Sequence, residues 1–144
     1  MTTAVDAIGI LPDDAGSFLL RGIVRSRLVV EKDFLRAEMI GRETAAETGQ
    51  FLNEVAAAVR EHGRSRVLVV VRESRAIFKV EDYGLSEYFK AMAEEPGGRV
   101  ALVGDSSETF AAHGYIELLA RQRGLPVRAF RDEAAALEWL RRDD

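Results

Sequence analysis

The stretch that decides the fold runs from Arg99 to Leu140 and reads RVALVGDSSETFAAHGYIELLARQRGLPVRAFRDEAAALEWL. Val100 to Val103 is an unbroken apolar run, which is typical of a strand buried on both faces of a parallel sheet. A second short strand is expected over Val127 to Phe130, after a helical stretch. Parallel strands joined through a helix form a right-handed crossover unit. The stretch therefore predicts strand, helix, strand and final helix in an α/β fold.

Capping residues mark the ends of both predicted helices. Ser106 or Ser107 can supply the N-cap oxygen of the first helix. Gly124 favours a left-handed C-terminal cap, and Pro126 prevents the helix from resuming. Asp132 is expected to cap the last helix. The capping residues thus predict where the helices of this stretch begin and end, and the apolar pattern predicts its strands.

This part of the chain resembles the SpoIIAA-like branch of the STAS domains (sulfate transporter and anti-sigma factor antagonist). The residues that carry the resemblance are RVALVGD from Arg99, RGLPVRAF from Arg123 and the closing EAAALEWL from Glu133. A weaker similarity extends back to about Leu28. The resemblance implies an α/β, single-domain STAS-like fold, with a mixed sheet of four to five strands and about four helices.

The composition excludes several classes of protein. An apolar content of 47% and a charged content of 31% describe an ordinary soluble globular chain. A net charge of −4 argues against nucleic-acid binding through bulk charge. The chain has no cysteine, which excludes a disulfide, a thiolate metal site and a cysteine nucleophile. Neither a membrane-spanning stretch nor a signal peptide is evident, and the lack of cysteine fits a cytoplasmic protein, which we expect. We also expect no cofactor.

Two parts of the chain are distinguished by composition. Residues 1–16 form a partly acidic leader that we expect to be loosely held. Residues 17–144 are expected to form one STAS-like domain, because no repeat or linker interrupts them. The segment from Ser17 to Ile23 can add an edge strand to this domain.

The middle of the chain is predicted to open with a β-hairpin over Arg27 to Ile40, where polar and apolar residues alternate. Thr44 and Glu47 form the pattern of a capping box, which begins a helix that ends near Gly63. Val67 to Val71 is the most apolar run and is predicted to be the central strand. A charged loop and a short amphipathic helix over residues 85–92 follow it.

The loop before that short helix matters most for the STAS resemblance. In anti-sigma factor antagonists, a phosphorylatable serine precedes a glycine in a pattern like Asp-Ser-Ser-Gly-Leu. The corresponding stretch here reads Glu81, Asp82, Tyr83, Gly84, Leu85, so the glycine and leucine match while a tyrosine replaces the serine. This departure argues against a serine phospho-switch, and a packing role is the alternative for the tyrosine. The candidate contacts for a ligand or partner in this region are Arg72, Phe78, Tyr83 and Gly84.

Asp105 and Ser106 complete the set of candidate binding residues. They follow a predicted parallel strand and precede a helix, the position where open α/β sheets often bind ligands. Backbone N–H groups there can hold an anion, but the Asp105 carboxylate would repel it and occupy the same donors. Simple helix capping is the structural alternative. No glycine-rich nucleotide motif accompanies them.

The sequence offers no recognisable catalytic set. His62 and His113 are the only histidines, and their separation along the chain does not favour a metal site. His113 is predicted to be a semi-buried member of an apolar helical stripe. No nucleophile elbow occurs, and no carboxylate lies in an apolar setting that would tune it for acid–base chemistry. We therefore expect a protein that is not an enzyme.

The helix after Ser106 has more apolar surface than one core face needs. Ala111, Tyr115 and Leu118 form a stripe beside the predicted core stripe. This second stripe is interpreted as an interface, for which a homodimer is the simplest arrangement. The alternative is that the last helix covers the stripe through Trp139.

Three functions remain open at this point. The first is a non-catalytic cytosolic module that binds a protein partner or a small apolar ligand. Similarity in fold to the CRAL-TRIO lipid-transfer domains supports the apolar ligand by analogy only. The second is a phosphorylation-controlled regulator of the anti-sigma factor antagonist type. The third is an enzyme with an unrecognised site.

Overall fold

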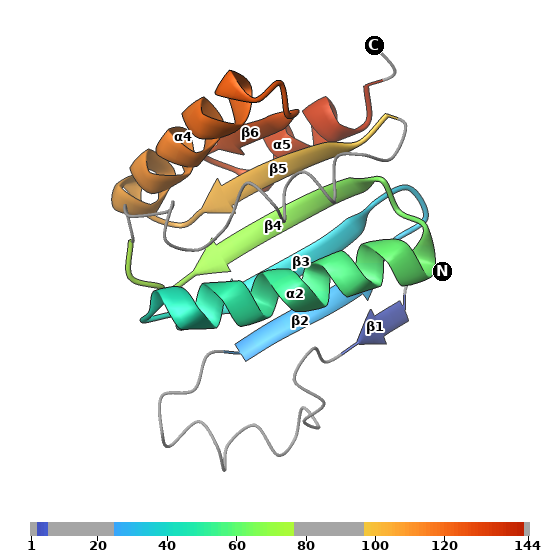
Figure 1. Cartoon of the computed structure of the whole chain (residues 1–144), viewed down its shortest axis with the longest axis horizontal. Coiled ribbons are helices and arrows are strands. Elements are labelled where there is room, and N and C mark those ends of the chain that lie inside the picture. The colour runs from blue at the N-terminus through green and yellow to red at the C-terminus, as the bar shows by residue number, and fades with distance from the viewer. Residues whose placement is uncertain (1–2, 6–24, 77–96, 143–144) are drawn as a thin grey trace.

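The computed structural model describes residues 3–5, 25–76 and 97–142 (Figure 1). These residues form a six-stranded mixed sheet in which the strands follow one another in chain order. The first three strands are antiparallel neighbours, and the last four are parallel. Their bounds are β1 Thr3–Val5, β2 Arg25–Val30, β3 Leu35–Ile40, β4 Arg66–Arg72, β5 Arg99–Gly104 and β6 Val127–Phe130.

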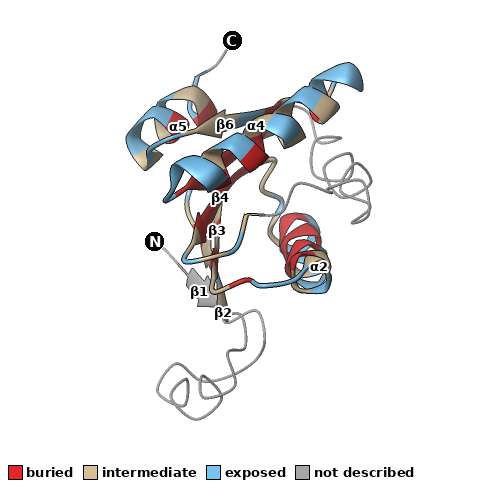
Figure 2. Cartoon of the chain, turned by 90° about the vertical axis from the view of Figure 1, so that its left-hand side faces the viewer, coloured by how far each residue is buried: buried red, intermediate tan, exposed pale blue. Residues whose placement is uncertain are grey.

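Three helices of the described residues cover the two faces of the sheet. They are α2 (Ala45–His62), α4 (Ser107–Gln122) and α5 (Glu133–Leu140). Helices α2 and α4 contribute to the larger apolar cluster on one face, whereas α5 packs in a smaller cluster on the other face. Figure 2 shows α2 and α5 on opposite sides of the sheet. The helices predicted after Thr44, Ser106 and Asp132 are thus confirmed.

Side-chain alternation explains why both faces are covered over β4 and β5. Val67, Val69 and Leu102 point toward the α2–α4 side, while Leu68 and Ala101 point toward α5. These parallel strands are therefore apolar at almost every position, as the sequence predicts. β4 lies between β3 and β5, so the prediction that it is the central strand is confirmed.

The β2–β3 hairpin has alternating apolar and polar residues, unlike β4 and β5, because one face of the hairpin is only partly covered. On β3, Leu35, Ala37 and Met39 are buried, while Arg36 and Glu38 are half-buried on the opposite face. The predicted alternation is therefore confirmed.

Capping residues mark the helix ends at the positions that the sequence predicts. Thr44 and Glu47 form a complete capping box at the start of α2, and Gly63 ends that helix with a left-handed φ of 62°. The side chain of Ser106 caps α4, and that of Asp132 caps α5.

One prediction of the architecture needs amendment. The leader contains β1, which pairs with Leu28 to Val30 of β2, so part of it belongs to the sheet and the strand count rises to six. The rest of the leader, the edge strand expected over Ser17 to Ile23 and the helix predicted over residues 85–92 lie outside the described residues, so these remain predictions.

Candidate functional site

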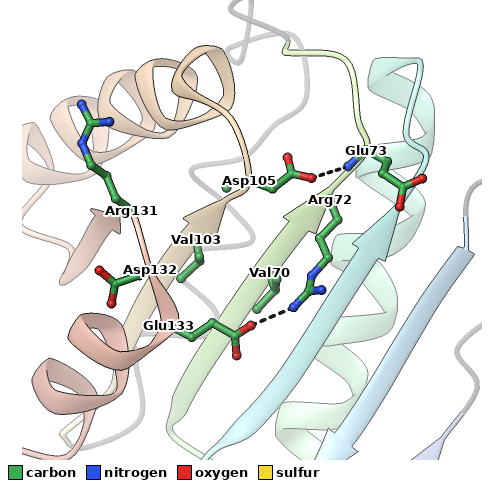
Figure 3. Close-up of a pocket in the computed structure, with 9 residues that line it drawn as sticks. Val70, Arg72, Glu73, Val103, Asp105, Arg131, Asp132 and Glu133 are labelled. Atoms are coloured by element: carbon green, nitrogen blue, oxygen red, sulfur yellow. Dashed lines mark hydrogen bonds and ion pairs between the residues drawn. The ribbon is translucent and has the colours of Figure 1, made fainter.

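A pocket of about 310 Å³ opens at the carboxyl ends of β4 and β5, beside the start of α5 (Figure 3). Val70 and Val103 form its apolar part, and the rest of its lining is charged or backbone. The remaining lining residues are Arg72, Glu73, Gly104, Asp105, Arg131, Asp132 and Glu133. The location follows the rule for open α/β sheets, in which the strand ends of parallel strands form the binding edge.

A ring of four charged side chains adjoins this pocket, and two of them, Arg72 and Glu133, line it. Glu133 of α5 accepts from Arg36 and Arg72, each through an Nη2–Oε2 distance of 2.9 Å. Glu38 accepts from Arg72 Nε at 2.9 Å and lies 3.8 Å from Arg36 Nη1. The two arginines and two glutamates neutralise each other, and the ring fixes the first turn of α5 over β3 and β4.

Two other carboxylates of the pocket, those of Asp105 and Asp132, also have structural partners. Asp105 Oδ2 accepts from the backbone N–H of Glu73 at 2.9 Å, which joins the loops after β4 and β5. Asp132 Oδ1 accepts from Ala135 N–H at 2.8 Å as the cap of α5. Arg131 points away from the pocket in Figure 3, and its guanidinium lies 4.3 Å from the ring centroid of Phe110. The arrangement therefore stabilises loops and offers no nucleophile paired with a base.

Ser106 and its neighbour Thr109 form the cap of α4. Ser106 Oγ accepts from Thr109 N–H at 3.1 Å and donates to Thr109 Oγ1 at 3.0 Å. A second, smaller pocket of about 200 Å³ lies here, lined in part by Ser106, Phe110 and Arg131. The Ser106 side chain therefore caps the helix, which is the structural alternative given above.

A buried polar cluster lies on the α2–α4 side of the same sheet edge. The Arg42 side chain donates to Thr48 Oγ1 at 3.3 Å and to the carbonyl of Arg75. Ser74 Oγ accepts from the Arg42 backbone N–H at 2.9 Å. His113 is 4% exposed, and within the described part of the chain its Nδ1 has no hydrogen-bond partner. Burial, followed by the positive charge of Arg42, lowers the pKa of His113 to about 4, so the imidazole is neutral near pH 7.

The α4 helix presents its second apolar stripe to solvent. Tyr115 is 37% exposed and Leu118 is 47% exposed, and Ala111 is exposed beside them. Glu117 holds this orientation, since its carboxylate accepts from Ala129 N–H of β6 at 2.7 Å and from Arg121 at 2.6 Å. We define Ala111, Tyr115 and Leu118 as the α4 outer face.

Trp139 does not cover the α4 outer face. It lies on the α5 side of the sheet, where it packs against Phe130 at 5.6 Å between ring centroids and under Arg99 at 5.3 Å. The alternative that the last helix buries the stripe is therefore wrong. The physical reason is that the chain leaves β6, the last strand, toward the face of the sheet opposite α4, and α5 packs there.

The structure brings together three of the predicted binding residues. Arg72, Asp105 and Ser106 lie at the carboxyl edge of the sheet, and they line one or other of its two pockets. Phe78, Tyr83 and Gly84 lie outside the described residues. Sequence reasoning missed Glu133 and Arg131; their position directly beside the cap residue Asp132, after a parallel strand, is the signal that could have identified them.

The described residues contain neither a metal-binding cluster nor a membrane-spanning helix. In residues 3–5, 25–76 and 97–142, no group of histidines and carboxylates is arranged to hold a metal ion. Across those same residues, every helix is too short or too polar to cross a membrane.

Comparison with known protein families gives a match over most of the chain. The sequence model of the family described as SpoIIAA-like matches residues 34–141 of the chain. No curated protein matches it. The matched span contains β3 to β6 together with α2, α4 and α5.

Proposed function

We infer that this chain, which belongs to the SpoIIAA-like family, is a non-catalytic cytoplasmic module that binds a protein partner through the α4 outer face. The observation that carries this proposal is the exposure of Tyr115 and Leu118 side by side on one helix. No other large apolar residue of the described chain is as exposed. A contiguous apolar patch with an aromatic residue is characteristic of an interface.

Charge pairing around the patch supports a protein partner. Glu117 and Arg121 form an ion pair beside Leu118, which gives the apolar centre a polar border. Interfaces commonly combine an apolar centre with a polar rim. Tyr115 is suited to be the anchor, because a tyrosine buries a large area and keeps a polar tip.

A small apolar ligand is less well supported by the described residues. The pocket at the carboxyl edge is bordered by Arg72, Glu73, Asp105 and Glu133, and only two valines give it an apolar part. Apolar ligands bind in pockets lined mainly by hydrophobic and aromatic side chains. A protein partner at the α4 outer face is therefore the function that we propose.

A second copy of the chain is the simplest partner to test. Leu118→Glu should convert a dimer into a folded monomer in light scattering, with little change in melting temperature because Leu118 is exposed. Ala134→Glu on α5 adds the same charge at another exposed helical position and serves as the control. A Leu118→Glu variant that unfolds would show that the stripe is part of the core, contrary to the proposal.

A further inference from the structure

The α4 outer face is arranged evenly about its own centre. Ala111 and Leu118 are separated by about two helical turns, so both lie on the same side of α4. The midpoint between them falls between Gly114 and Tyr115. Figure 2 shows exposed residues along the side of α4 that faces away from the sheet. A small and a large apolar side chain thus lie at equal distances from one central point.

Charged side chains of opposite sign lie at the two ends of the same helix. Glu108 is exposed in the first turn of α4, and Arg121 is exposed in its last turn. These two residues are also equally distant from the midpoint of the α4 outer face. Arg121 pairs with Glu117 at 2.6 Å, but its side chain remains 70% exposed, so a second carboxylate can approach it. The helix therefore has an acidic end and a basic end on either side of an apolar centre.

On the premise that this face is the partner-binding surface proposed above, we propose that its partner is a second copy of the chain, with the two α4 helices packed antiparallel. A two-fold axis at the level of Gly114 and Tyr115 reverses the direction of the helix in the second copy. Each Ala111 then lies opposite Leu118 of the second copy, so a small side chain meets a large one. Tyr115 meets Tyr115 of the second copy beside the axis, where an aromatic pair stabilises the contact.

A parallel pair of α4 helices fits the same residues less well. It would place Leu118 against Leu118 and Ala111 against Ala111, which crowds one level of the interface and leaves a gap at the other. It would also place Glu108 level with Glu108 and align the two helix dipoles, and both effects are repulsive. The antiparallel pair instead places Glu108 level with Arg121 of the second copy at each end. Charge and side-chain size therefore favour the same orientation.

The size of the surface predicts a reversible dimer. α4 has 16 residues and is therefore about 24 Å long. One helix from each copy buries less than the roughly 1,600 Å² of a standard protein–protein interface. We therefore expect dimerisation that depends on protein concentration.

Cysteine cross-linking tests the proposed orientation on the full chain, because the natural sequence has no cysteine. Ala111→Cys and Leu118→Cys are made as separate variants and are oxidised alone and as an equal mixture. The mixture should give a covalent dimer, since a disulfide needs Cβ atoms about 3.5–4.5 Å apart. Each variant alone should give little dimer, because its two cysteines would lie about 10 Å apart along the antiparallel pair. Ala134→Cys on α5 is the exposed control and should not cross-link.

A charge reversal tests the ends of the interface independently. Glu108→Arg should weaken dimerisation in sedimentation equilibrium by about threefold or more, because two charge pairs are lost and repulsion replaces them. Glu138→Arg on α5 changes the net charge equally at another exposed position and should dimerise as the wild type does. Equal dissociation constants of these two variants would contradict the antiparallel arrangement.

Two further results would overturn the proposal. Antiparallel packing is wrong if Ala111→Cys alone, or the Ala134→Cys control, cross-links as well as the mixture does. A wild-type chain that stays monomeric at high concentration, with no cross-linking of the mixture, would exclude a second copy as the partner. That result would leave the α4 outer face available to a different protein, which photo-cross-linking at position 118 would identify. The absence of any protein adduct at that position would instead refute the proposed function itself.

Discussion

Gly104→Ala should destabilise the domain, because Gly104 lies where the end of β5 touches α4. A Cβ added at this position would lie 2.5 Å from Thr109 Cγ2 and 2.9 Å from Thr109 Cβ. It would also lie 3.4 Å from His113 Cε1. Carbon atoms in contact prefer about 3.5–4.0 Å, so the overlap with the methyl group is about 1 Å. Thr109 is 1% exposed and its hydroxyl is bound to Ser106, so it cannot move away freely.

The expected loss is that of an overpacked core. Inserting a methyl group into a packed interior costs about 1–3 kcal/mol, which corresponds to a fall in melting temperature of about 3–9 °C for a domain of this size. The control is Gly114→Ala in the middle of α4, where no atom lies within 4 Å of the added Cβ. That change should raise stability by about 0.5–1 kcal/mol, since alanine favours a helix over glycine.

A double-mutant cycle identifies the contact responsible. Thr109→Ser removes the methyl group 2.5 Å from the added Cβ and can retain the hydroxyl that binds Ser106. In the double variant, Thr109→Ser should recover at least about 0.5 kcal/mol of the Gly104→Ala loss. Urea unfolding followed by circular dichroism measures all four proteins. A Gly104→Ala loss below about 0.5 kcal/mol, or no recovery in the double variant, would refute the close approach of β5 and α4.

Three further predictions follow from burial and charge. Leu102→Ala should cost about 2–5 kcal/mol in urea unfolding, because Leu102 is 3% exposed in the core; a loss under about half a kcal/mol would remove β5 from the core. His113 has a folded pKa of about 4 and an unfolded pKa of about 6.5, so it destabilises the domain as the pH falls through that window. His113→Gln should therefore lose less stability than wild type between pH 6.5 and 4, and parallel pH profiles would contradict the burial of a neutral imidazole. Incubation with cognate kinases should leave the peptide from Arg72 to Leu85 unmodified, because Tyr83 replaces the serine; stoichiometric phosphate on Ser74 would show otherwise.

The architecture could be predicted where the signals are local. Alternation in residues 35–40 defined the two faces of β3, and an unbroken apolar run identified β4 as the central strand. Thr44, Ser106 and Asp132 defined the helix starts, because each capping interaction involves residues only three positions apart. Interactions of this kind depend only on residues that are near each other in the chain, so one sequence is enough to predict them.

The candidate site depends on contacts between distant residues. Arg36 and Glu133 are 97 positions apart, and their ion pair requires knowledge of which face α5 covers. The same information decides that Trp139 packs away from the α4 outer face. Charged residues are common on surfaces, so their pattern alone could not show which of them form the ring.

Photo-cross-linking at the α4 outer face tests the central claim most directly. A photoreactive amino acid is placed at Leu118 in one protein and at Ala134, an exposed position on α5, in the control. After irradiation in the host cell, mass spectrometry identifies the adducts of each. The account predicts a discrete protein adduct at position 118, of a second copy or of another protein, that is absent at position 134 and is lost when Tyr115 is changed to glutamate. Identical adduct patterns at the two positions would contradict the claim that the α4 outer face binds a protein partner.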